Sequence, residues 1–256
     1  MRYMMRYKLF EDDEQFFEIF HVHTKRCNHA TGEDREYIEA AIDMMAKRIV
    51  FTDHAPFPGD PFGNRMKMSE YDEYLDTFTA LKEEYASQIE ICKGFEIEYL
   101  PSFTSYYEKL KADERVDVLL LGQHFYEIKP GEYSLSLPDR SHEYTGLTED
   151  IVEAYKTGYF DVVAHPEKIF KRCDDTVNYH DIITCIYKIT QSVPDDMYLE
   201  DNYASICVFK HAFWVRARSN LSMKSIKGYD AHSVKDLEEY GWSLQSYKRL
   251  LEKYSK

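Results

Sequence analysis

Most of the histidines in this chain stand at or just beyond the ends of short apolar runs, where an imidazole can bind a metal ion. Seven of the ten histidines do so, and two acidic residues stand in matching places. The nine residues are His21, His23, His29, His54, Glu96, His124, His165, Asp230 and His232. Neutral imidazole is the commonest metal ligand in proteins, and carboxylates bridge divalent ions readily. Their recurrence at one point of a repeated unit predicts a multinuclear metal site assembled from several strand ends.

The first two histidines form an HxH pair, and strand geometry decides what such a pair can do. Residues i and i+2 of a strand face the same side. His21 and His23 can therefore reach one ion while Val22 packs behind them. Asp230 and His232 repeat this spacing near the end of the pattern.

At two places neighbouring residues compete for the role of ligand. Asp53 and His54 face opposite sides if their strand continues, and we take His54 as the ligand and Asp53 as a supporting residue. Glu96 and Glu98 share a face, so spacing alone leaves open which of them could bridge two cations. No cysteine joins the pattern, and we take Cys27, in the first loop, as a bystander.

The number and type of ligands indicate the chemistry. Nine nitrogen or oxygen ligands are enough for three divalent ions of borderline type, such as Zn²⁺, Mn²⁺ or Fe²⁺. Three dications beside two carboxylates leave a charge of about +4, which suits a phosphate dianion and its transition state. Such ions acidify a water and hold phosphoryl oxygens for in-line attack. We therefore expect metal-dependent phosphoester hydrolysis, with Asp230 and His232 as candidate catalytic residues.

The elements that must position these side chains alternate along the chain. Strand-like runs lie near 16–23, 48–53, 89–97, 116–123, 160–164, 197–200 and 225–229. Helical patterns follow after Thr31 and Ser69, and near 102–113, 148–157, 179–190 and 233–254. This alternation predicts an α/β fold with a parallel sheet. Seven units with polar residues at nearly every strand end favour a closed barrel, whose site lies at the C-terminal rim, over an open doubly wound sheet.

Two loops stand out between these elements. Residues 55–65 contain three of the eight prolines and two of the ten glycines, which predicts an extended, turn-rich loop over the site. Residues 125–148 are expected to form a second long, mostly polar loop.

Composition indicates a single domain over residues 1–256 and excludes several classes of protein. The chain is 44% hydrophobic and 30% charged, with a mean hydropathy of −0.56, as in a soluble globular protein. No apolar stretch approaches the roughly 20 residues that span a bilayer, and no signal peptide is evident. Five widely spaced cysteines indicate reduced thiols, and we expect a cytoplasmic protein. The oligomeric state is left open.

The net charge of the chain further limits the classes of binding partner that we expect. The formal net charge of −14 disfavours nucleic acid, whose binders carry basic stripes, but leaves room for a small phosphorylated substrate. Lys168, Lys171 and Arg172 form the longest basic cluster and are candidates for binding the substrate phosphate, with Arg65 as another.

The ordered motifs resemble those of the PHP (polymerase and histidinol phosphatase) superfamily: HxH, a DH pair, a strand-end Glu, two single histidines and a final DxH. The resemblance extends from about residue 16 to 236 and is greatest to the histidinol-phosphatase-like branch, through TDHAPFPGDPFGNRM, GFEIEYLPSF, LLLGQHF and AHPE. It implies a distorted (β/α)7 barrel with a trinuclear site, and hydrolysis of L-histidinol phosphate in histidine biosynthesis. The implied ligands are His21, His23, Glu96 and Asp230 for the first ion; Glu96, His124 and His165 for the second; and His29, His54 and His232 for the third.

The resemblance also has departures, and these keep the substrate open. The family's final motif usually reads GSDAH, whereas Tyr229 stands here in place of the serine, and LEDN replaces a more apolar sixth strand. The metal ligands are all present, but substrate contacts in 197–229 can differ. Alternatives are therefore a PHP phosphoesterase acting on a nucleotide, a sugar phosphate or a phosphotyrosine protein, and a non-catalytic metal-binding module.

Overall fold

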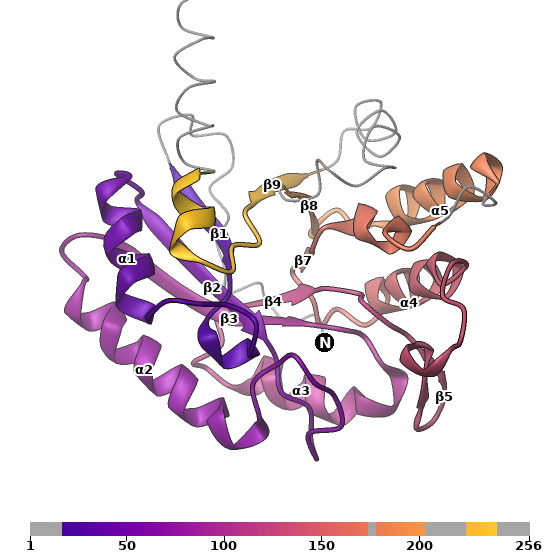
Figure 1. Ribbon diagram of the computed structural model, residues 1–256, viewed down its shortest axis with the longest axis horizontal. Helices are drawn as coiled ribbons and strands as arrows, with labels where there is room; N and C mark the ends of the chain where they lie inside the picture. Colours follow the sequence, from indigo (N-terminus) through magenta and orange to yellow (C-terminus); the bar gives the residue numbers. More distant parts are fainter. Residues whose placement is uncertain (1–16, 174–177, 203–223, 240–256) are drawn as a thin grey trace, which may run out of the picture. The chain divides into compact units, whose positions relative to one another are not determined.

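The computed structural model describes residues 17–173, 178–202 and 224–239 (Figure 1). These residues group into two compact units. The flanking unit contains residues 17–94 and 229–239, and the central unit contains the described residues between 95 and 228. One strand, β3 (Glu90–Ile97), begins in the flanking unit and ends in the central unit.

Two parallel strands form the core of the flanking unit, β1 (Glu18–Val22) and β2 (Arg48–His54). Every residue of β2 is buried. Helices α1 (Asp34–Asp43) and α2 (Tyr71–Glu84) cover β2 with aromatic side chains. The Phe51 ring lies 6.3 Å from the Tyr37 ring of α1 and 4.3 Å from the Phe78 ring of α2. This packing holds the C-terminal end of β2, where His54 stands, in one position.

The segment that follows the last strand returns to β1. The Tyr229 N–H donates to the Phe20 carbonyl at 2.9 Å, and Val22 and Ala231 form a parallel bridge. The register of β1 against β2 shifts between Phe20 and Val22, so His21 occupies a bulge. Residues 20–23 and 229–232 therefore lie side by side in the flanking unit.

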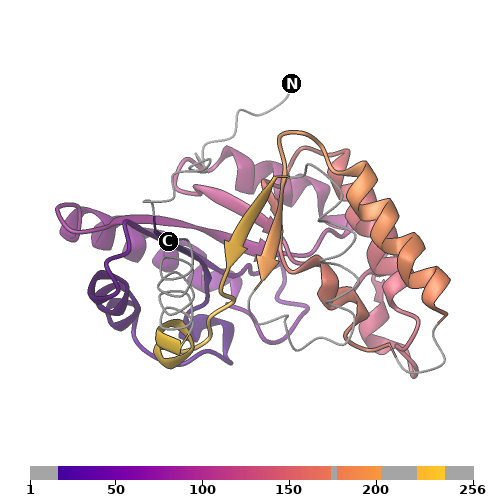
Figure 2. The ribbon, with the colours of Figure 1, turned by 90° about the horizontal axis from the view of Figure 1, so that it is seen from above.

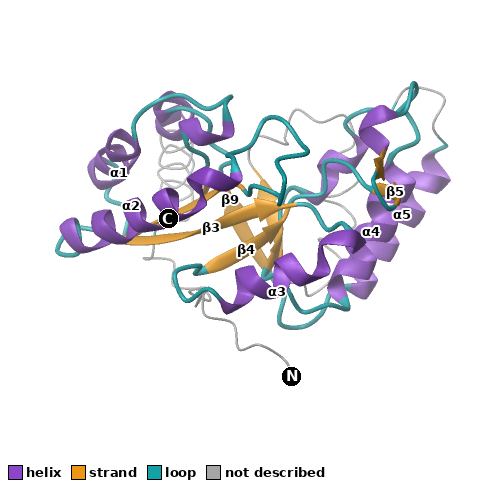
Figure 3. Ribbon diagram, turned by 90° about the horizontal axis from the view of Figure 1, so that it is seen from below, coloured by secondary structure: helices purple, strands orange, loops and turns teal. Residues whose placement is uncertain are grey.

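The central unit is a parallel sheet with helices. Its strands are hydrogen-bonded in the order β3, β4 (Val118–Leu121), β7 (Val162–Val163), β8 (Tyr198–Asn202) and β9 (Ser225–Gly228). Figure 2 shows β8 and β9 side by side. Its helices are α3 (Thr104–Ala112), α4 (Tyr144–Tyr155) and α5 (Tyr179–Ser192). Helices α4 and α5 pack together (Figure 3), and α5 buries Ile182, Ile186 and Ile189.

All seven expected strands are present, and the differences lie in the connections. The segment 125–148 is not a simple loop, because it contains a hairpin of β5 (Glu127–Lys129) and β6 (Glu132–Tyr133), and α4 begins within it. Loop 55–65 contains neither helix nor strand, as expected. Most of the expected helix 233–254 lies outside the described residues.

The two expected helix starts are too early, by two residues at α1 and by one residue at α2. Helix α1 is capped by Glu33, whose N–H donates to Glu36 at 2.7 Å. Thr31 lies two residues before this cap and donates its N–H to the His232 carbonyl at 2.8 Å. Ser69 lies in the 3₁₀ turn Met68–Glu70 that precedes α2.

Candidate metal centre

His21, His23 and Asp230 converge at the end of β1. The His23 Nε2 atom lies 3.1 Å from His21 Nε2 and 3.1 Å from Asp230 Oδ1, and His21 Nε2 lies 3.6 Å from the same oxygen. Both histidines are fully buried. Ligand atoms about 2.0–2.1 Å from a tetrahedral Zn²⁺ lie about 3.3 Å apart, so these spacings match the edges of a coordination shell. The donor set of two imidazoles and a carboxylate fits a borderline divalent cation.

His29 and His232 form a second close pair of possible ligands, with their Nε2 atoms 3.0 Å apart. His29 Nδ1 donates to the Cys27 carbonyl at 2.9 Å, and His232 Nδ1 donates to the Asp230 carbonyl at 3.0 Å. Each ring is therefore the tautomer whose Nε2 has a lone pair. Burial lowers the pKa of His232 to about 4, which keeps this imidazole neutral, the form that binds metal.

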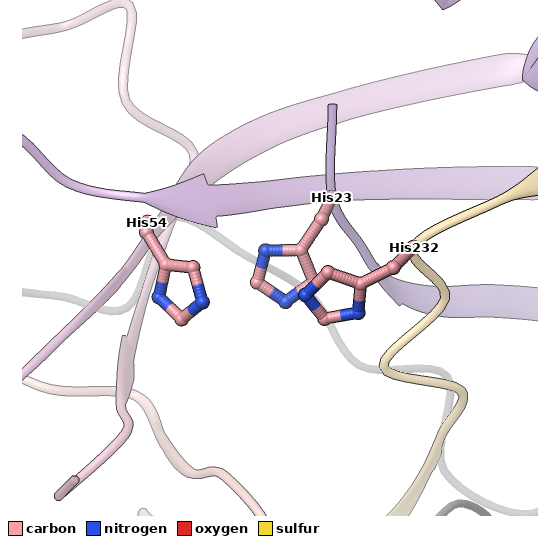
Figure 4. Close-up of side chains that lie close together, drawn as sticks. All are labelled: His23, His54 and His232. Atoms are coloured by element: carbon pink, nitrogen blue, oxygen red, sulfur yellow. The ribbon is translucent and has the colours of Figure 1, made fainter. Parts of the chain in front are cut away.

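His54 completes the group in the flanking unit. A ring nitrogen of each of His23, His54 and His232 lies within 4.8 Å of the others (Figure 4). The three side chains come from the end of β1, the end of β2 and the segment after β9. The flanking unit thus brings together six of the nine predicted ligands.

Asp53 contacts this group at the other ring nitrogen of His23, and with His23 and Cys27 it forms a further set of possible ligand atoms within 4.8 Å of one another. Its Oδ1 accepts a hydrogen bond from His23 Nδ1 at 3.4 Å, which leaves the Nε2 lone pair of His23 directed at His21 and Asp230. The same carboxylate accepts from the Thr24 hydroxyl and from the His54 N–H. A buried carboxylate that fixes the tautomer of a ligand is the arrangement expected of a supporting residue.

The remaining three predicted ligands converge in the central unit. Glu96 Oε1 lies 2.7 Å from His165 Nε2 and 3.4 Å from His124 Nε2. Gly122 leaves room for this carboxylate, because a Cβ at that position would overlap it. A fully buried carboxylate between two imidazole nitrogens fits a divalent cation.

Glu98 contacts the group formed by Glu96, His124 and His165 at a different atom. It is buried, and its Oε1 accepts from His124 Nδ1 at 2.9 Å, which directs His124 Nε2 toward Glu96. Both glutamates that the spacing left open therefore contact His124, one at each ring nitrogen. The i, i+2 spacing in GFEIEY was the signal for this pair.

Three of the predicted ligands have left-handed backbone conformations, which the sequence pattern did not reveal. The φ angles are 68° at His21, 28° at His165 and 51° at Asp230. Such conformations cost about 1–3 kcal/mol at residues other than glycine and occur often at functional sites.

Cys27 lies closer to the ligands than its expected role of bystander suggests. Its Sγ is within 4.8 Å of ring nitrogens of His29 and His232. Burial, together with the Asp53 charge, raises the pKa of the Cys27 thiol to about 12, which keeps it protonated. All four cysteines of the described segments are free thiols, whereas Cys207 lies outside them.

The four candidate phosphate-binding residues differ in their surroundings. Arg65 is buried, donates from Nη1 to the Ala55 carbonyl at 3.2 Å, and stacks over Phe57 and Phe62. Lys171 is exposed. Arg172 lies 3.8 Å from the Glu143 carboxylate, and Lys168 is half-buried.

Comparison with known proteins identifies relatives over part of the chain. A protein named probable histidinol-phosphatase from Deinococcus radiodurans is 32% identical over 157 residues, which cover 57% of this chain and 58% of that protein. The Bacillus subtilis histidinol-phosphatase is 33% identical over 90 residues, 32% of this chain and 34% of that protein. The chain therefore spans between about a third and three fifths of the length of these relatives.

Solved structures with the same fold cover more of the chain. A histidinol phosphate phosphatase from Lactococcus lactis, in complex with zinc, L-histidinol and phosphate, matches with a TM-score of 0.70 at 16% identity, over 91% of this chain and 93% of that one. The candidate histidinol phosphatase of Listeria monocytogenes matches with a TM-score of 0.69 at 20% identity, over 86% and 96%. This likeness confirms the expected (β/α)7 barrel fold class. The PHP domain model matches residues 20–204, and the chain therefore belongs to the PHP domain family.

Proposed function

We propose that this protein is a metal-dependent phosphomonoesterase. The observation on which the proposal rests is the convergence of His21 Nε2, His23 Nε2 and Asp230 Oδ1 at 3.1–3.6 Å, beside a second set of imidazole nitrogens. Membership of the PHP domain family supports it. Bound divalent ions would supply Lewis acidity to the phosphoryl group and lower the pKa of a water.

The proposed ligand set comprises all nine residues predicted from the sequence. His21, His23, His29, His54, Asp230 and His232 are proposed from the flanking unit, and Glu96, His124 and His165 from the central unit. Our hypothesis is that these nine residues bind three ions and that Glu96 is the bridging carboxylate. The zinc in the Lactococcus lactis structure supports zinc as one of the metals.

Asp230 and His232 are the proposed catalytic residues. They stand two residues apart in one segment, and the His232 ring donates to the Asp230 carbonyl, which holds both side chains in a defined relation. We infer that they face the reacting phosphate, where the left-handed backbone of Asp230 keeps the carboxylate beside His21 and His23.

The proposed substrate is L-histidinol phosphate. The names of the two sequence relatives, and the L-histidinol and phosphate in the Lactococcus lactis structure, support this choice. Among the four basic candidates, Arg65 has the strongest support as a phosphate ligand. Its guanidinium is held by Phe57, Phe62 and the carbonyl of Ala55, the residue that follows His54, so little side-chain entropy is lost on binding an anion. Lys168, Lys171 and Arg172 remain further candidates.

The proposal is tested by measuring phosphate release from L-histidinol phosphate, with the metal content of the same preparation determined by elemental analysis. A panel with p-nitrophenyl phosphate, a nucleotide, a sugar phosphate and a phosphotyrosine peptide identifies the preferred ester. We expect release from L-histidinol phosphate to be fastest, and the variants His21→Ala and Asp230→Ala to lose both metal and turnover. Full turnover in metal-free protein would refute the proposal, and a faster reaction with another ester would refute the substrate.

A further inference from the structure

Glu200 is a fully buried carboxylate that the proposed reaction does not use. It stands on β8 in the LEDN segment, and its Oε2 accepts a hydrogen bond from the His165 N–H at 2.7 Å. The same oxygen accepts from Asn202 Nδ2 at 3.0 Å. A buried carboxylate is costly unless hydrogen bonds compensate for its lost hydration, so these contacts place Glu200 firmly.

The backbone of His165 has an unusual conformation, which a hydrogen bond to its N–H can hold in place. Its φ and ψ angles are 28° and 58°, outside the helical and strand regions, and Pro166 begins a 3₁₀ turn directly after it. A residue persists in a conformation of this kind only where its surroundings hold it there. The His165 N–H points to the Glu200 carboxylate, while the ring of His165 reaches Glu96 at 2.7 Å. The angle at which the ring leaves the backbone therefore depends on where the N–H is held.

The neighbouring strand leaves room for this carboxylate. In the parallel pairing of β8 with β9, Gly228 stands opposite Asn202. A Cβ on Gly228 would overlap the Glu200 carboxyl group. Glycine at this position thus allows β9 to approach β8 closely while the Glu200 carboxylate stays between β9 and the His165 N–H.

We propose that Glu200 is a positioning residue, which holds the His165 backbone in its left-handed conformation and thereby aims the imidazole at Glu96. Gly228 is the second part of this arrangement, because it leaves space for the carboxylate. The inference rests on the proposed role of Glu96, His124 and His165 as ligands of one ion. It does not depend on which phosphoester the protein hydrolyses.

The test compares two replacements of Glu200 with a matched control. Glu200→Gln keeps an oxygen that can accept from the His165 N–H, whereas Glu200→Met has a similar volume and no acceptor. Asp201→Asn, at the adjacent, part-exposed acid of β8, removes the same charge and serves as the control. Two properties are measured: hydrogen exchange of the His165 amide in metal-free protein, and the number of zinc ions bound at saturation.

We expect the His165 amide to be protected in the natural chain, in Glu200→Gln and in Asp201→Asn, each with full zinc. In Glu200→Met we expect exchange at least tenfold faster and zinc affinity lowered about 10- to 100-fold at one ion only, the range typical for loss of a group that supports a ligand. Rapid exchange of this amide in the natural chain would overturn the proposal without any variant. Equal losses in Glu200→Gln and Glu200→Met would also overturn it, because the charge rather than the acceptor would then matter.

Both properties are measured without substrate, so they separate this inference from the proposed function. A protein that binds zinc and protects His165 but hydrolyses no phosphoester would refute the function and leave the inference standing. Should Glu200→Met fail to fold, Glu200→Gln and the natural chain decide the outcome: protection in both supports the acceptor role, and its loss in either overturns it.

Discussion

His29 and His232 present their Nε2 atoms to each other at 3.0 Å, and each ring donates its Nδ1 hydrogen to a backbone carbonyl. Two lone pairs at this distance repel unless a proton or a cation lies between them. Since burial lowers the pKa of His232 to about 4, a proton on that ring is disfavoured at neutral pH. A metal ion is the partner that this geometry suits.

The first prediction follows from this pair. His232→Ala and His29→Ala should each reduce bound metal by about one equivalent and lower kcat, because one ion loses an imidazole ligand. Elemental analysis of the purified variants measures the metal. His142→Ala is the matched control, since His142 is exposed and belongs to neither group of ligands. Full metal content in both variants would contradict the assignment.

The contact between Glu98 and His124 leads to the second prediction. Replacing Glu98 with Gln removes the carboxylate that fixes the His124 tautomer, and we expect metal affinity to fall about 10- to 100-fold. Competition with a chelator of known affinity measures the change. Glu108→Gln, at an exposed position of α3, removes the same charge and should have no effect. If both variants bind metal equally well, Glu98 does not support the site.

Removal of metal should destabilise the protein. Ligand atoms that approach to 3.0–3.1 Å repel once the cation is gone, and an ion that binds only the folded state stabilises it by about 4 kcal/mol at a thousandfold excess over Kd. Since about 1 kcal/mol shifts Tm by 2–4 °C at this chain length, we expect a loss of roughly 10 °C on chelation. Thermal unfolding followed by circular dichroism, with zinc returned to the same sample, measures it. An unchanged Tm would argue against buried metal.

Arg65 provides a prediction about the substrate. Because a charged hydrogen bond contributes about 1.5–3 kcal/mol, Arg65→Ala should lower kcat/KM by about ten- to a hundredfold if the guanidinium binds the phosphate. Steady-state kinetics with L-histidinol phosphate measure the change, and Lys171→Ala, an exposed candidate, serves as the comparison. A larger loss in Lys171→Ala would transfer the role to the cluster that follows His165.

Asp150 leads to a prediction about pH and stability. Burial raises the pKa of this carboxyl to about 7, and Gln123 Nε2 donates to it at 3.2 Å. The folded chain then holds a proton that the unfolded chain, with a pKa near 3.9, releases, so the contribution of Asp150 to stability is greatest below about pH 4 and is lost as the pH rises through about 7.

Asp150→Asn should therefore be more stable than the natural chain at pH 8, by about 1–2 kcal/mol once partial exposure is allowed for. Its free energy of unfolding should also change less between pH 4 and 7 than that of the natural chain. Urea unfolding at several pH values provides the measurement, and Glu83→Gln, an exposed acid of α2, is the control. A parallel pH dependence in Asp150→Asn and the natural chain would show that the carboxyl is ionised when folded.

The strands and the residues at their ends could be predicted because both depend on local sequence. Apolar runs such as VLLL between polar segments indicate buried strands, and the side chain that follows each run stands at the strand end. The HxH pair was expected from the alternation of a regular strand, yet His21 stands in a bulge with a φ of 68°. The two rings still meet, because the bulge and the pairing with Ala231 bring them together.

What could not be predicted depends on partners far away in the sequence. The Thr31 backbone contacts His232, and helix α1 begins at Asp34, after the Glu33 cap, rather than directly after Thr31. Glu200 accepts from His165, 35 residues earlier, and spacing within β8 contains no sign of that contact. The β5–β6 hairpin was missed because its strands are three and two residues long, too short for a periodic signal.

The left-handed backbone of His21, His165 and Asp230 limits how the proposed ligands could be transplanted. A designer who copied only the side-chain types onto a regular barrel would place these three ligands on strand ends with ordinary angles, and their donor atoms would point elsewhere. Grafting would have to include the bulge in β1, the acceptor on β8 and the backbone pairing of Ala231. What would have to be transferred is therefore a set of main-chain conformations together with the nine proposed ligand side chains.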